Sequence, residues 1–71
     1  MTPAERNHKV ARLSVLAAMA ERSPADANIT WDSAVGIVGE AMARRVDHLA
    51  STSERIDRLI QIVDAREGGH A

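Results

Sequence analysis

The three histidines, His8, His48 and His70, are the residues best suited to bind a metal or transfer a proton near neutral pH. None stands three or four positions from another histidine, the spacing that places two metal ligands on one face of a helix. The chain has no cysteine, which excludes disulfide bonds and thiolate zinc sites. We therefore expect surface histidines, with no metal site and no cofactor.

Most of the glutamates are accounted for by helix stabilisation rather than by acid–base chemistry. Three of them precede a basic residue by four positions, which is the favourable order for an ion pair within a helix. These pairs are Glu5 with Lys9, Glu40 with Arg44, and Glu54 with Arg58. The sequence also has no glycine-rich phosphate loop, nucleophile elbow or His-Glu zinc motif. We therefore predict a protein that is not an enzyme.

Two clusters of basic residues are candidate phosphate contacts. They are Arg6, Lys9 and Arg12 near the N-terminus, and Arg44 and Arg45 in the middle of the chain. A dimer would double these contacts, so a small DNA-associated regulator is the alternative function. Nine basic residues against ten acidic ones, and the lack of an aromatic stacking platform, favour solvated helix faces instead.

A helix over residues 3–22 is predicted by signals at both of its ends. Thr2 and Glu5 have the spacing of a capping box, and Pro3 occupies the first helical position, where proline is favourable. Ser23 precedes Pro24 and is therefore disfavoured in the helical region, which ends the helix. A loop over residues 23–28 then leads to the next helix, which we expect to lie antiparallel to the first.

The segment 10–20 is apolar on nearly all sides of this first helix. One side carries Val10, Leu13, Leu16, Ala17 and Ala20, and another carries Ala11, Val15, Ala18 and Met19. A helix that is apolar nearly all round is usually buried nearly all round. We therefore expect the rest of the chain, or a second copy of it, to surround this helix.

A heptad pattern extends over most of the remaining sequence. Apolar residues recur at intervals of seven, at Val35, Met42, Leu49, Ile56 and Val63. With Thr30 as its N-cap, a continuous helix over residues 31–66 would be about 54 Å long at 1.5 Å per residue. The spacing of Ser51 and Glu54 is that of a second capping box, and we favour a break there, giving helices over 31–50 and 52–66.

Two glycines, Gly36 and Gly39, lie within the predicted helix 31–50. Each glycine inside a helix costs about 1 kcal/mol relative to alanine. Two glycines within four residues therefore predict that another helix approaches closely on that side.

A chain of 71 residues with one tryptophan and no phenylalanine or tyrosine can build only a small core. Such a core rarely supplies more than about 3–5 kcal/mol, so association is an expected source of further stability. We predict an all-α helical hairpin or three-helix bundle that forms a homodimer with a coiled-coil-like seam. The candidate interface residues are Val46, Leu49, Ile56, Leu59, Ile60 and Val63.

The composition also bears on location and partners. No apolar run approaches the ~20 residues of a membrane span. The run 13–20 follows basic residues as in a signal peptide, but it is short and Glu5 precedes it, so we expect a cytoplasmic protein that does not bind membranes. The favoured function is a regulator, inhibitor or adaptor that binds another protein.

Overall fold

Helices make up nearly all of residues 2–68, the part of the chain that this computed structural model describes, with side chains given for residues 2–65. The elements are α1 (Pro3–Arg22), the short 3-10 helix η1 (Pro24–Asp26), α2 (Ala27–Val38), α3 (Glu40–Ala43) and α4 (Thr52–Gly68). No strand occurs within this range. The predicted all-α class is therefore confirmed.

The predicted ends of α1 are confirmed by the hydrogen bonds around them. The Thr2 hydroxyl oxygen accepts from the Glu5 backbone N–H at 3.1 Å, and the same hydroxyl lies 3.2 Å from Glu5 Oε1, to which it donates. At the other end, the Ser23 N–H donates to the Met19 carbonyl at 2.9 Å. Pro24 then begins η1, so that the chain turns within three residues.

The second helix begins earlier than predicted, because η1 continues directly into α2 at Ala27. Thr30 is therefore inside the helix, where the sequence predicted an N-cap. Its side chain is buried, and its hydroxyl donates to the Asp26 carbonyl at 3.1 Å. A threonine inside a helix commonly satisfies its hydroxyl in this way, which makes its burial tolerable.

The prediction of one helix over residues 31–50 is wrong, and so is the continuous helix over 31–66. The chain leaves the helical conformation at Gly39, whose φ of 90° lies in the left-handed half of the Ramachandran plot. The single turn of α3 and an irregular segment over residues 44–51 follow. The predicted break at Ser51 is confirmed, because the Ser51 hydroxyl accepts from the Glu54 N–H at 3.1 Å at the start of α4.

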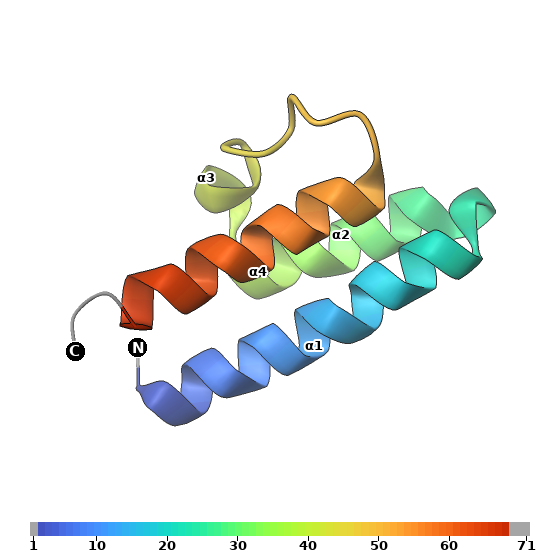
Figure 1. Cartoon of the computed structure of the whole chain (residues 1–71). Coiled ribbons are helices and arrows are strands. Elements are labelled where there is room, and N and C mark those ends of the chain that lie inside the picture. Colours follow the sequence, from blue (N-terminus) through green and yellow to red (C-terminus); the bar gives the residue numbers. More distant parts are fainter. Residues whose placement is uncertain (1, 69–71) are drawn as a thin grey trace.

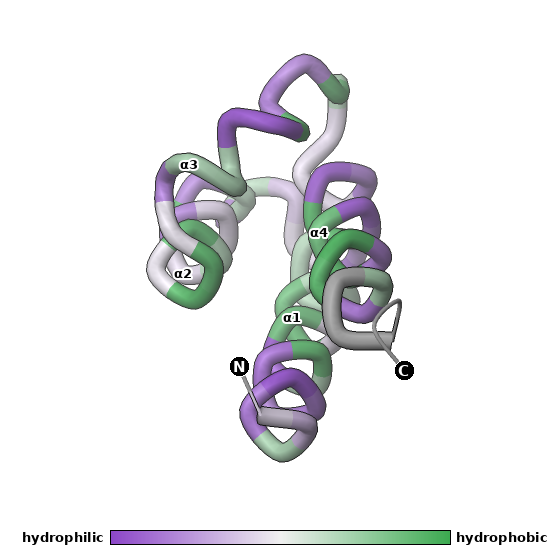
Figure 2. The backbone as a smooth tube through the Cα atoms, turned by 90° about the vertical axis from the view of Figure 1, so that its left-hand side faces the viewer, coloured by the Kyte–Doolittle hydropathy of each residue, from purple (hydrophilic) through white to green (hydrophobic). Residues whose placement is uncertain are grey.

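The long helices form a three-helix arrangement in which α1 is antiparallel to both α2 and α4 (Figure 1). Viewed along the helices, α1, α2 and α4 occupy the three corners, and α3 lies above α2 (Figure 2). The buried hydrophobic residues of the core between them are all aliphatic, and partly buried residues that include Trp31 pack against them. The buried members of this core are Leu13, Ala17, Ala20, Ala34, Val46, Ile56, Leu59 and Val63.

The expected close approach of a helix to the glycines is wrong. A Cβ atom added at Gly36 or at Gly39 would have no atom other than its near neighbours within 4 Å. Gly39 is instead required by its positive φ, which side-chain-bearing residues rarely adopt. Gly36 lies inside α2 with open space beside it, and nothing in the structure requires a glycine there.

Alanine substitutions at these two glycines should therefore have opposite effects on stability. Gly39→Ala should lower the free energy of unfolding by about 1–2 kcal/mol, because the new Cβ strains the left-handed backbone. Gly36→Ala should raise it by up to about 1 kcal/mol through helix propensity. Urea unfolding followed by circular dichroism measures both values, and a loss of stability in Gly36→Ala would contradict the open space beside that residue.

Candidate partner-binding surfaces

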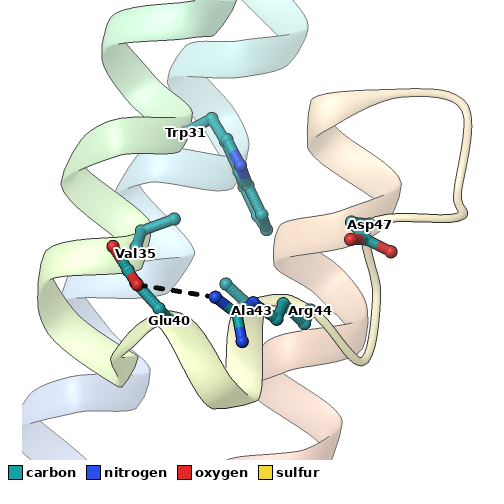
Figure 3. Close-up of a pocket in the computed structure, with 6 residues that line it drawn as sticks. All are labelled: Trp31, Val35, Glu40, Ala43, Arg44 and Asp47. Carbon is teal, nitrogen blue, oxygen red and sulfur yellow. Dashed lines mark ion pairs between the residues drawn. The ribbon is translucent and has the colours of Figure 1, made fainter.

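A shallow hollow of about 260 Å³ lies where α2, α3 and the segment after α3 meet (Figure 3). Its lining residues are Trp31, Val35, Glu40, Ala43, Arg44 and Asp47. Glu40 and Arg44 form an ion pair at 3.8 Å with side chains that are 81% and 77% exposed, so solvent screens this pair and it adds little stability. Of the three predicted helical pairs, this is the one that forms an ion pair within residues 2–65.

Trp31 has a structural role, because its ring contacts Arg55 of α4. The guanidinium carbon of Arg55 lies 5.5 Å from the centroid of the indole ring, within the range of a cation–π interaction. The same guanidinium donates from Nε to the Leu49 carbonyl at 2.8 Å. Arg55 therefore joins α4 to α2 and also holds the segment 44–51 in place.

Removal of the Arg55 side chain should loosen this part of the fold. Arg55→Ala should lower the free energy of unfolding by about 1–2 kcal/mol, because it removes a cation–π contact and a charged hydrogen bond. Emission from Trp31, the sole tryptophan, should shift to longer wavelength as the ring gains solvent. Arg58→Ala is the control on the exposed side of α4 and should change neither quantity, whereas equal effects of the two substitutions would contradict the assigned role of Arg55.

The residues predicted to form a dimer interface are mostly inside the core of the single chain. Val46, Ile56, Leu59 and Val63 are at most 1% exposed. This burial follows from the turn over residues 44–51, which returns α4 onto α1 so that its apolar stripe faces the chain's own core. The other two candidates, Leu49 and Ile60, are half-buried at the edge of that core. In this fold they are the two that a second copy could reach.

The candidate phosphate contacts do not form one basic surface. Arg6 and Lys9 are half-buried and Arg12 is exposed on α1, whereas Arg44 and Arg45 are exposed just after α3. Figures 1 and 2 both place α3 on the side of the molecule opposite the first turns of α1. Among the histidines, His8 and His48 are exposed, and His70 lies outside the described residues. No group of three or more potential metal ligands lies together within the described part of the chain.

Two hollows of about 290 Å³ each follow one another between α1 and α2, and we call them together the α1–α2 groove. The first is lined by Arg12, Val15, Leu16, Ser33 and Ile37. The second is lined by Met19, Arg22, Ser23, Asp26 and Thr30. Because Met19 is one turn after Val15, and Thr30 one turn before Ser33, the two hollows run along the same pair of helices.

The groove is bordered by the most exposed large apolar side chains in the described residues. Val15 is 59% exposed, Met19 43% and Ile29 69%. Ile29 stands one turn before Ser33 and so lies on the same side of α2. Ala11 and Ala18 on the outer side of α1 are exposed as well. We expected both apolar sides of α1 to be covered. Within one chain, α2 and α4 cover only the side that carries Leu13, Ala17 and Ala20.

No protein-family model matches this sequence, and no similar protein was found among curated proteins or among solved structures. None of the helices in residues 2–68 combines the length and the apolar character that crossing a bilayer requires.

Proposed function

We propose that this protein is a small non-enzymatic interaction module, a regulator, inhibitor or adaptor, that binds another protein through the α1–α2 groove. The observation that carries the proposal is the exposure of Val15, Met19 and Ile29 beside that groove. Covering apolar surface contributes about 25 cal/mol per Å², so a partner gains stability by burying these side chains. Clustered exposed apolar residues on a small protein are typical of an interaction site.

The opposite side of α1 supports the proposal, because it holds the groove in a fixed shape. Leu13 is fully buried and Ala17 and Ala20 are nearly so, which anchors α1 against the core. Eight of the ten lining residues lie on the regular helices α1 and α2, so little backbone remains to be ordered when a partner binds. A surface organised in advance in this way loses less conformational entropy on binding than a mobile loop would.

The proposal can be tested by replacing single residues in or beside the groove with a photo-crosslinking amino acid in the native host. Variants at Val15 and Ile29 should give covalent adducts with a protein, whereas a variant at Asp57 on the exposed side of α4 should not. Adducts of twice the chain's mass would identify the partner as a second copy, bound through a different surface from the seam of residues 46–63 predicted for the homodimer. Crosslinks to nucleic acid, or no adduct at either Val15 or Ile29, would contradict the proposal.

A further inference from the structure

We infer that the segment bound in the α1–α2 groove is an amphipathic helix of another protein, with acidic side chains placed against Arg12 and Arg22. This inference rests on the proposed function and names the chemistry of the partner. Three observations support it: the charges of the residues that line the groove, the groove's length and apolar lining, and the poor fit of a second copy of this chain to the groove.

The charges on the groove favour an acidic ligand. Arg12 lines one of its hollows and Arg22 lines the other, and no ion pair joins either of them to a carboxylate among residues 2–65. Asp26 is the single carboxylate among the ten lining residues, so the groove carries two positive charges and one negative, a net of +1. The chain as a whole has a net charge of −1, so the lining of the groove is more basic than the chain on average. Such complementarity steers and orients a charged partner.

The shape of the groove favours a helix. Two adjacent antiparallel helices leave a depression between them into which a third can pack. The apolar part of its lining consists of Val15, Leu16 and Met19 from α1 and Ile37 from α2, of which Leu16 and Ile37 are half-buried. Arg12 and Arg22 are ten residues apart on α1, which is about 15 Å or three helical turns. A partner helix of similar length would present apolar anchors one turn apart and a carboxylate near each end.

A second copy of this chain supplies no such helix. In a symmetric dimer each chain uses the same patch, so pairing through the groove would bring two net-positive faces together. Over residues 52–65, the exposed side of α4 carries polar and charged residues and no large apolar anchor. These residues are Glu54, Asp57, Arg58, Gln61 and Asp64. The charges and the apolar side chains thus both point to a different protein.

Two synthetic peptides test the inference directly. Each is a fluorescein-labelled helix of about 18 residues with leucines one turn apart, and they differ only in carrying either two glutamates or two lysines ten positions apart. Fluorescence anisotropy with the full chain should show that the glutamate peptide binds about tenfold more tightly than the lysine peptide. The double variant Arg12→Glu/Arg22→Glu should instead prefer the lysine peptide. The control double variant Arg45→Glu/Arg58→Glu, whose substitutions lie outside the groove, should keep the preference for the glutamate peptide. Val15→Asp should weaken both peptides, and circular dichroism should show that all variants fold.

The outcomes separate this inference from the proposed function. Equal affinities for the two peptides, or an unchanged preference in Arg12→Glu/Arg22→Glu, would overturn the acidic helix while leaving the crosslinks at Val15 as support for an interaction module. Crosslinks to a second copy of the chain would also overturn it. Vesicles of phosphatidylserine and phosphatidylcholine are the third probe. If the protein binds these vesicles and the Val15→Asp variant does not, the groove binds a lipid surface and the acidic-helix inference is overturned.

Discussion

Leu59→Ala is expected to leave much of the protein unfolded at room temperature. Leu59 is fully buried and belongs to the same core cluster as Leu13 and Ile56. Truncation of a buried leucine to alanine costs about 2–5 kcal/mol, from lost burial and from the cavity that remains. A single core in a chain of this size supplies about 3–5 kcal/mol in total. The loss is therefore comparable to the whole stability of the fold.

The measurement is far-ultraviolet circular dichroism of Leu59→Ala against urea and temperature, with loss of the cooperative transition expected. Ile29→Ala is the matched control, because it also removes part of a large aliphatic side chain, but from a position that is 69% exposed. Its effect should stay within about 0.5 kcal/mol, as for most surface substitutions. A Leu59→Ala protein as stable as Ile29→Ala would contradict the placement of Leu59 in the core.

The parts of the fold that the sequence predicted are those set by local hydrogen-bonding signals. The Thr2–Glu5 capping box and the Ser23–Pro24 boundary fix both ends of α1, and each acts within a few residues. The start of α4 follows in the same way from Ser51, whose hydroxyl caps the helix. Such signals predict structure well because the groups that form the bond are neighbours in the chain.

Periodicity was a poor guide where a single backbone angle decides the structure. Val35, Met42 and Leu49 recur at intervals of seven and predict one continuous seam. The positive φ of Gly39 ends α2 between the first two of these residues, and a repeat of apolar residues carries no information about that angle. Thr30 is a comparable case, since a residue favoured as a cap is also tolerated inside a helix when its hydroxyl bonds to a carbonyl one turn earlier.

An apolar stripe in a sequence also does not show which surface covers it. The stripe that includes Ile56, Leu59 and Val63 was predicted to face a second copy, but α4 turns back and buries these residues inside the chain. The second apolar side of α1, which includes Val15 and Met19, was expected to be covered and is exposed. The buried and the exposed apolar surfaces are thus the reverse of those predicted, and the exposed one borders the candidate site. Which surface is buried depends on the path of residues 44–51, and therefore on contacts between distant parts of the chain.

Ala17→Leu and Ala18→Leu form the second test of how α1 is used, because these neighbours lie on different sides of the helix. Ala17 is 8% exposed and belongs to the core cluster, whereas Ala18 is exposed. A leucine at position 17 overpacks the core and should lower the free energy of unfolding by about 1–3 kcal/mol. At position 18 it should be nearly neutral, since alanine and leucine have similar helix propensities.

Urea unfolding of the two variants, combined with sedimentation velocity at micromolar concentration, decides between the covered and uncovered sides of α1. The core described above requires a large loss of stability for Ala17→Leu and an unchanged sedimentation coefficient for Ala18→Leu. If a homodimer used the outer side of α1 instead, Ala18→Leu would alter the distribution between monomer and dimer. Equal destabilisation by both variants would mean that α1 is surrounded on both sides in solution, and the α1–α2 groove would then be closed to other partners.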